Sequence, residues 1–308
     1  MKLSTKQWKK AKDYIHQNAR PLEQKLFIYY FEGGSKDEAI YELSCYQNED
    51  GGFGKSIEPD YRLDNSSPLA TTIGLQKAKD LKLPAGHPIV QKAMDYLNNT
   101  YLEEIHGWSA VPEKVNSVPH APWWHFDPEK GHCGVQTAWA NPNAEIVGYF
   151  HRFQPEHHRL QEWTDRAVNE LTKLETPIDM HDFLCYDRML HEVGGDTKST
   201  LFKILSSNVR STVCMDPSRW NEYVAKPLQV ASGPTSPFFR VLKEIIQIQL
   251  GNELELQHPD GFWQPNWSWF GHYTETWPVA EKEWRGILTL DMLRVFRAYN
   301  MTVIPYER

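Results

Sequence analysis

A short motif that occurs twice is the feature that most constrains how this chain folds. Residues 47–53 read QNEDGGF and residues 257–263 read QHPDGFW. In both copies an Asp lies three residues after the Gln, a Gly lies four residues after it and an aromatic residue lies six residues after it. Each copy follows an apolar segment with helical periodicity and precedes another. Repeated units of this kind are typical of architectures in which similar helical elements stack on one another, so the motif predicts helical hairpins.

The remaining sequence favours helices over strands. Several segments begin with a capping side chain followed by Pro at the first helical position, as in Ser67-Pro68 and Ser236-Pro237. Apolar residues three apart between Ile287 and Phe296 form one stripe of a helix. Helices are expected to begin near Thr5, Ser35, His87, Glu156, Asp196 and Ser236, and near Pro21, Ser66, Asn141, Thr176, Lys226 and Trp284. The pattern predicts an all-α fold of about six helical hairpins, in a single domain that covers residues 1–308.

Residues 101–140 form the longest stretch without helical periodicity. The stretch is rich in Pro, Gly and His, and it contains four of the twelve tryptophans. Loops of this length in a compact domain are usually either functional or disordered. Because large aromatic side chains favour burial, we expect an ordered insertion here.

Composition narrows the class of protein. The 308 residues include 33 Lys and Arg against 40 Asp and Glu, a net charge of −7, which argues against a protein that binds nucleic-acid phosphates. The four cysteines form no CxxC pair and are too sparse for a disulfide framework. The sequence also lacks the apolar segment of a secretory signal and the run of about 18 apolar residues that crosses a membrane. We therefore expect a cytoplasmic protein without a transmembrane segment, and the sequence indicates no particular protein partner.

The repeated motif resembles that of the terpenoid cyclase and protein prenyltransferase superfamily, which includes the squalene-cyclase-like repeats. The resemblance rests on residues 47–53, on residues 257–263 and on the segment 289–299 (TLDMLRVFRAY) that follows the second copy. Members of that superfamily fold as an α/α toroid, with six inner helices surrounded by six outer helices. The resemblance implies this architecture here, with a central cavity for a hydrophobic, isoprenoid-like substrate.

The resemblance also points to catalytic candidates. Cyclases that begin by protonating their substrate carry a DxDD motif at the N-terminus of an inner helix, and the nearest match is Asp179-Met180-His181-Asp182. His181 occupies the position of the acid, and Asp179 and Asp182 flank it. The Asp-rich DDxxD motif and the zinc-binding Asp-x-Cys motif of other members do not occur. We therefore expect no metal and no cofactor, with zinc on His132-Cys133 or on the Asp187/His191 pair as the alternative.

The segment 119–126 (PHAPWWHF) concentrates two imidazoles and three aromatic side chains between prolines. Such a rigid aromatic wall beside a titratable histidine suits the mouth of a cavity. His120 is a candidate catalytic residue, and Trp123, Trp124 and His125 are candidate binding residues. The alternative interpretation is a loop that buried aromatic residues anchor.

Two further groups of side chains are candidates for the same cavity. Asn141 and Asn143 open a predicted inner helix and would bind substrate, while Glu145 would act as a general acid or base if it is partly buried. The aromatic residues Trp267, Trp269 and Trp277 follow the second motif. Their π faces suit an isoprenoid, a carbocation or a sugar ring. Capping and hairpin packing are the structural alternatives for these two groups.

Three functions are compatible with this sequence. The first is an enzyme that acts on a hydrophobic, isoprenoid-like substrate in the manner of a cyclase or a prenyltransferase. The second is a carbohydrate-active toroid, a lyase or a hydrolase, which would stack a sugar on tryptophan. The third is a toroid that binds such a small molecule without converting it. Fold alone does not decide among them.

Overall fold

The computed structural model describes residues 1–302, and the last six residues of the expected domain lie outside this range. The expectation of an all-α fold is confirmed for the described chain. Its α-helices are α1 (Thr5–Asn18), α2 (Pro21–Phe31), α3 (Lys36–Ser44), α4 (Pro68–Asp80), α5 (Pro88–Asn99), α6 (Ala140–Phe153), α7 (Leu160–Lys173), α8 (Met180–Leu190), α9 (Gly195–Thr212), α10 (Pro227–Val230), α11 (Phe239–Glu255) and α12 (Trp277–Ala298). Short 3-10 helices are η1 (Glu103–Ile105), η2 (Glu113–Ser117), η3 (Pro122–Trp124) and η4 (Pro217–Arg219). The strands β1 (Phe126–Asp127) and β2 (His132–Cys133) pair antiparallel.

Local capping explains where several helices begin. Ser67 accepts a hydrogen bond from the amide of Ala70 and Pro68 follows it, as the sequence predicts for α4. The prediction of a helix start at Thr176 is wrong by a few residues, because Asp179 is the N-cap of α8. The segment expected to begin near Lys226 forms only the single turn of α10.

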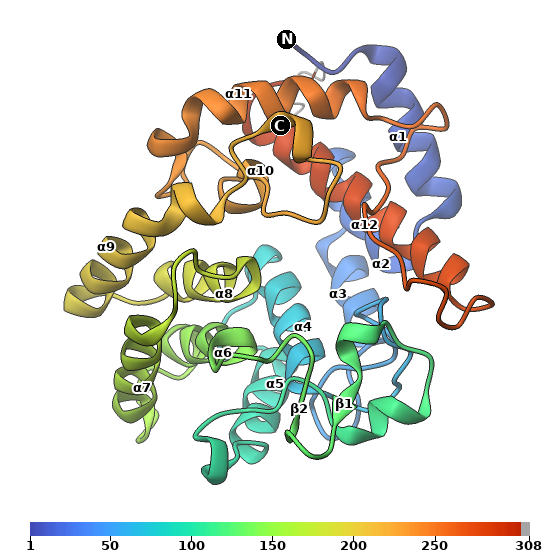
Figure 1. Cartoon of the computed structure of the whole chain (residues 1–308). Helices are drawn as coiled ribbons and strands as arrows, with labels where there is room; N and C mark the ends of the chain where they lie inside the picture. Colours follow the sequence, from blue (N-terminus) through green and yellow to red (C-terminus); the bar gives the residue numbers. More distant parts are fainter. Residues whose placement is uncertain (303–308) are drawn as a thin grey trace. The chain divides into compact units, whose positions relative to one another are not determined.

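The chain divides into two compact units. The first unit comprises Met1–Ala39, Val213–Ser268 and the described residues from Thr274 onward, and the second comprises Ile40–Thr212 together with Trp269–Tyr273. In the first unit α1 packs against α2 and α12, and α10 packs against α11 (Figure 1). In the second unit α6 packs against α4, α5, α7 and α8 (Figure 1). Helix α6 is therefore the centre of the second unit.

The first copy of the repeated motif lies in the second unit and ties a turn to two helices. The side-chain amide of Gln47 donates to the carbonyls of Gly51 and Ile89, at 2.8 and 2.9 Å. The amide N–H of Phe53 donates to the hydroxyl of Thr71 in α4 at 3.0 Å. The motif thus links the turn to the first turn of α5 and to α4.

The second copy repeats these contacts within the first unit. The side-chain amide of Gln257 donates to the carbonyls of Gly261 and Gln7, both at 3.0 Å. The amide N–H of Trp263 donates to the hydroxyl of Thr289 in α12 at 3.0 Å. Helix α1, at the start of the chain, therefore holds the position in this unit that α5 holds in the other.

The motif requires Gly because the chain adopts a left-handed conformation against a neighbouring helix. Gly51 has φ of +90° and Gly261 has φ of +102°. A Cβ atom at either position would lie 2.3 Å from a backbone carbonyl oxygen, that of Lys92 or that of Lys10 respectively. Any other residue would meet both backbone strain and a steric clash.

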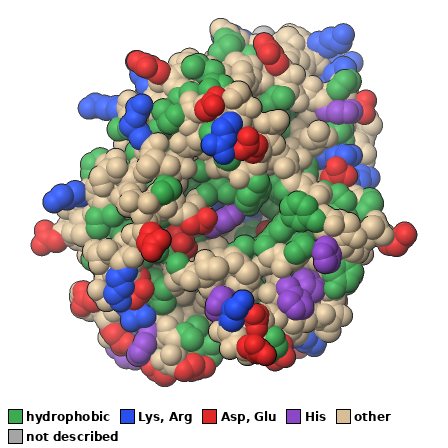
Figure 2. Space-filling view, viewed as in Figure 1, with side chains coloured by type: hydrophobic (Ala, Val, Ile, Leu, Met, Phe, Trp, Pro, Cys, Tyr) green, Lys and Arg blue, Asp and Glu red, His purple; other side chains and the backbone are tan. Residues whose placement is uncertain are grey.

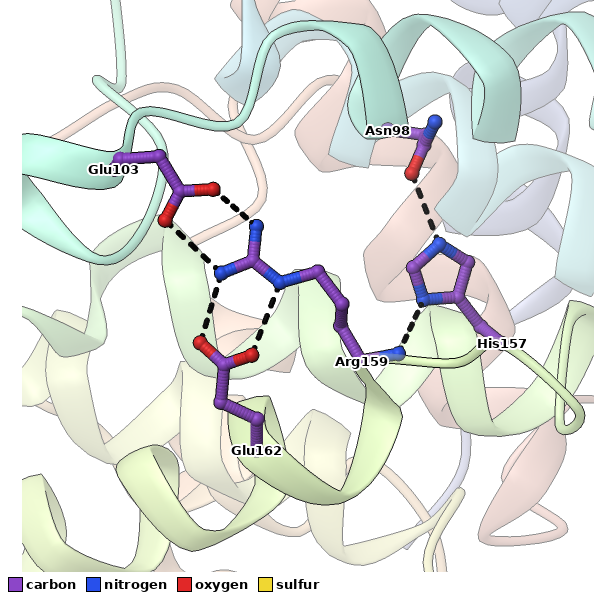
Figure 3. A network of polar contacts seen from close by, with 5 residues as sticks. All are labelled: Asn98, Glu103, His157, Arg159 and Glu162. Carbon is purple, nitrogen blue, oxygen red and sulfur yellow. Dashed lines mark hydrogen bonds and ion pairs between the residues drawn. The ribbon is translucent and has the colours of Figure 1, made fainter.

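The long insertion is ordered, and two kinds of contact hold it. Trp108 is fully buried and packs edge-on against Trp163 of α7, with ring centroids 5.2 Å apart. Burial of such a side chain contributes on the order of 2 kcal/mol or more to stability. Arg159, just before α7, forms forked ion pairs with Glu103 at the start of the insertion and with Glu162 of α7 (Figure 3). His157 beside it bonds to Asn98 of α5 (Figure 3).

The surface carries charge of both signs. On the face drawn in Figure 2, Lys and Arg side chains are interspersed with Asp and Glu and form no continuous cationic track. None of the helices within residues 1–302 combines the length and apolarity that crossing a bilayer requires.

Candidate functional site

Two aromatic segments that are distant in the sequence meet in the second unit. The indole N–H of Trp269 donates to the Asp60 carboxylate at 2.8 Å. Tyr273 lies against His120 with ring centroids 5.5 Å apart. In addition, Phe270 meets Trp123 edge-on at 6.4 Å. The segment 269–273 and the segment 119–126 therefore form one cluster, which we call the histidine–aromatic site.

Backbone pairing next to Asp60 fixes the segment 119–126. The amide of Arg62 donates to the Pro119 carbonyl at 2.8 Å, and the amide of Ala121 donates to the Asp60 carbonyl at 2.7 Å. These bonds flank an isolated antiparallel β-bridge between Tyr61 and His120. The backbone thus places His120 beside the buried Asp60, independently of either side chain.

The hydrogen bonds of the two histidines determine their tautomers. His120 Nδ1 lies 2.6 Å from the Val118 carbonyl, which can only accept, so Nδ1 carries the proton. In a neutral ring His120 Nε2 is then an acceptor, and it lies 3.1 Å from His125 Nδ1. His125 must therefore donate from Nδ1. Its Nε2, on an exposed ring, keeps a free lone pair.

Burial keeps the inner histidine neutral. His120 is 4% exposed. Burial lowers the pKa of its imidazole below the ordinary value, and the neighbouring His125 and His272 lower it further. Its bond to Val118 opposes these effects without reversing them. A neutral His120 is the state in which its Nε2 accepts from His125, so the charge and the hydrogen bonds agree.

Exposed aromatic side chains flank the histidine pair. Phe270 is 74% exposed and Tyr273 is 42% exposed, although both are large and apolar enough to favour burial. Both residues have left-handed backbones, with φ of +52° and +49°. Each such conformation costs about 1 kcal/mol or more in a residue with a side chain. The segment therefore holds two aromatic rings at the surface against both solvation and backbone preference.

Trp124 lies behind this surface. It is 7% exposed and packs edge-on against Tyr61. Among the described residues its indole N–H has no hydrogen-bond partner. Buried indoles usually find an acceptor, so this N–H is an unused donor next to the site.

A second polar cluster joins α4, α6 and α8. The Glu145 carboxylate is 2% exposed. It accepts from Gln76 at 2.9 Å, from the hydroxyl of Tyr149 at 2.6 Å and from Arg188 at 2.9 Å. Three donors, one of them cationic, therefore occupy the oxygens of this carboxylate. The geometry of Glu145 is that of a residue that orients Arg188.

The Asp179-Met180-His181-Asp182 segment forms the start of α8. The Asp179 carboxylate accepts from the amide of His181 at 2.8 Å, which is the contact of an N-cap. Asp182 is 6% exposed, and no side chain within residues 1–302 donates a hydrogen bond to it. Burial, and then the charge of Asp179, raise the pKa of Asp182 to about 7. Burial lowers the pKa of His181.

The remaining sequence candidates have structural partners. Asn143 is 1% exposed, accepts from the amide of Trp108 and donates to the carbonyl of Trp139, so it ties the insertion to α6. Asn141 Oδ1 lies 3.7 Å from the Cys185 thiol. Trp267 packs edge-on against Trp284 in the first unit, and Trp277 is the first residue of α12 there.

Sequence reasoning did not select Gln76 and Arg188, which the structure places in the Glu145 cluster. The structure also brings Asp60, Phe270 and Tyr273 into the histidine–aromatic site. The aromatic run from 267 to 277 was a usable signal for Phe270 and Tyr273. No local pattern distinguishes Arg188 from the other charged residues of a helix.

The part of the chain that the structure describes contains no group of three or more His, Cys, Asp or Glu side chains placed to hold a metal ion. The His132 ring bonds to the Cys133 carbonyl, and His191 Nε2 lies 3.6 Å from Asp187. Each of these pairs has at most two ligands of the three that a catalytic zinc requires.

Comparison of this chain with protein-family models, with curated proteins and with solved structures finds no match in any of the three. The resemblance carried by the repeated motif therefore stays a prediction.

Proposed function

We propose that this chain is an enzyme that binds a hydrophobic, isoprenoid-like substrate against Trp123, Phe270 and Tyr273, and that His125 serves as its general base. The observation that carries the proposal is the convergence of a hydrogen-bonded histidine pair with an exposed aromatic surface. Either feature alone has ordinary structural explanations. Together they supply both an apolar binding surface and a group that can accept a proton.

The hydrogen-bond chain assigns a role to each histidine. His125 takes a proton at Nε2, the nitrogen without a partner among the described residues. His120 receives the Nδ1 proton of His125 in a hydrogen bond and so holds the ring in the required tautomer. A neutral imidazole suits removal of a proton from a carbocation or from an attacking hydroxyl group.

We also propose that the helices close into the α/α toroid that the motif resemblance implies. The equivalent contacts of Gln47 and Gln257 support this arrangement, because α1 completes the last motif as α5 completes the first. A chain whose first helix fills the place of a following helix suits a closed ring. A cytoplasmic location stays part of this proposal.

A carbohydrate substrate is the second candidate, and Asp60 and Glu58 favour it. Asp60 is 3% exposed and Glu58 is 7% exposed, and the Glu58 carboxylate accepts from the amide of Asp60 at 3.2 Å. Two carboxyl groups beside exposed aromatic rings are also what glycoside hydrolysis uses. Incubation with oligosaccharides separates this candidate from the first.

The test is incubation with isoprenyl diphosphates and with neutral polyprenes, followed by product analysis. We expect turnover of one class. We expect His125→Gln to lower kcat by about a hundredfold or more with little change in KM. Trp123→Ala and Phe270→Ala should instead raise KM. His158→Gln is the matched control, since His158 neighbours a histidine but lies outside the site. The proposal fails if no probe is bound or converted, or if the His125 variant keeps full activity.

A further inference from the structure

An open pocket of about 280 Å³ lies in the second unit, and neither His120 nor His125 belongs to its lining. The start of α4, the end of α5 and the insertion contribute its walls. The rings of Tyr96 and Phe126 line it, and the Glu113 carboxylate belongs to the same lining. Of the described residues that line the pocket, none is Lys, Arg or His. The formal charge of the lining is therefore negative.

The serine and threonine hydroxyl groups of this pocket have already used their protons. Ser66 donates to the Asp50 carboxylate at 2.7 Å and Thr100 donates to the Tyr96 carbonyl at 2.8 Å. Ser109 donates to a backbone carbonyl at 2.9 Å. Each hydroxyl has one proton and two lone pairs, so these three groups can only accept from a ligand. A ligand that is itself anionic or rich in acceptors would find few donors here.

Tyr96 is one of the two aromatic residues in the lining of this pocket. It is 8% exposed, and its ring lies so close to Gly52 that a Cβ atom there would be 2.8 Å from the ring. No described residue forms a hydrogen bond with its hydroxyl group. Burial, and then the charge of Asp50, raise the pKa of this hydroxyl. The negative charge of Asp50 therefore adds to that of Glu113 around the pocket.

We propose that this pocket binds a small organic ammonium ion. The cation would lie against the faces of Tyr96 and Phe126, with Glu113 as its counter-ion. Aromatic rings attract a cation through their quadrupole, and a nearby carboxylate adds Coulombic attraction. The pocket volume matches a ligand of a few heavy atoms, below the range of drug-sized sites. The proposal does not depend on the enzyme function assigned to the histidine–aromatic site.

The test uses three probes of one shape and different charge. Choline is the cation. Neohexanol (3,3-dimethylbutan-1-ol) has carbon in place of the choline nitrogen and is neutral, and tert-butylacetate (the 3,3-dimethylbutanoate ion) is the anion. Isothermal titration calorimetry of the full chain measures the affinity for each. We expect saturable binding of choline, much weaker binding of neohexanol and none of tert-butylacetate. Equal affinity for choline and neohexanol, or no saturable choline binding, overturns the proposal.

Variants of the lining locate the site. We expect Glu113→Gln to weaken choline binding about fivefold, since the carboxylate is exposed to solvent. Phe126→Leu should weaken it by a similar factor, and far-UV circular dichroism checks that this variant folds. Glu104→Gln is the matched control, because Glu104 is an exposed acid of the same insertion outside the pocket. Choline binding that all three variants leave unchanged contradicts the assignment.

Discussion

The indole of Trp269 donates a hydrogen bond to the carboxylate of Asp60, a residue 209 positions earlier in the chain. The five residues Trp269–Tyr273 belong to the second unit, while the chain on both sides belongs to the first. Within this segment, Phe270 and Tyr273 lie beside Trp123 and His120. The bond of Trp269 with Asp60 is thus one of the contacts that form the histidine–aromatic site.

Removal of that bond should destabilise the second unit. Trp269→Phe keeps most of the buried ring but leaves the buried Asp60 carboxylate without one donor. We expect the free energy of unfolding in urea to fall by about 1 to 3 kcal/mol. Trp123→Phe makes the same chemical change in a half-buried indole whose N–H has no hydrogen-bond partner among the described residues, and it should cost less. Equal losses in the two variants would refute the importance of this bond.

The two copies of the motif should respond alike to substitution. Gln47→Ala and Gln257→Ala each remove two hydrogen bonds to backbone carbonyls, so each should cost about 1 to 3 kcal/mol. Hydrogen exchange should show faster amide exchange at the start of α5 in the first variant and at the start of α1 in the second. Gln91→Ala, on the exposed face of α5, is the control. Loosening of α1 by the Gln47 variant, or no local effect, contradicts the expectation.

Asp182 should make the stability of the protein fall as pH rises. Its pKa is about 7 in the folded state, against about 3.9 in an unfolded chain. Between these values the folded state binds more protons than the unfolded state, so the free energy of unfolding decreases with pH.

Asp182→Asn should therefore stabilise the protein by roughly 2 to 4 kcal/mol near pH 8 and have little effect near pH 4. Urea unfolding at the two pH values measures this difference. Asp95→Asn, an exposed change on α5, should have no pH-dependent effect. A destabilising effect of Asp182→Asn near pH 8 would show that the carboxylate has a partner in its ionised form.

The forked ion pairs of Arg159 should stabilise the insertion more than an isolated surface pair does. Arg159→Lys loses the planar fork that serves two carboxylates and the contact of the guanidinium with Tyr101, at 4.3 Å from the ring centroid. We expect a loss of about 1 kcal/mol that shrinks in about 1 M salt.

Arg219→Lys is the matched change at an arginine that, within residues 1–302, forms an ion pair with Glu222 alone. Its effect on the free energy of unfolding should be close to zero. Thermal or urea unfolding of both variants at low and high salt measures the comparison. A loss at Arg159 that does not change with salt would assign its effect to packing on Tyr101 and would contradict the ionic explanation.

The sequence by itself determined the helical class of the chain, the paired motifs and the ordered insertion. These features depend on local chemistry: apolar periodicity, capping side chains, Pro at helix starts and Gly where φ is positive. The same local signals located the aromatic segments 119–126 and 267–277. They did not locate the start of α8, where Asp179 rather than Thr176 caps the helix, or the short length of α10.

Only the tertiary structure decided which polar side chains keep unused hydrogen-bonding capacity. Glu145 and Asn143 read as candidate site residues, yet protein partners occupy both. In His125 the hydrogen bond of Nδ1 with His120 leaves Nε2 without a partner among the described residues. A hydrogen bond such as that of Trp269 with Asp60 has no sequence signature, since its energy depends on two side chains meeting in space and on the water they exclude.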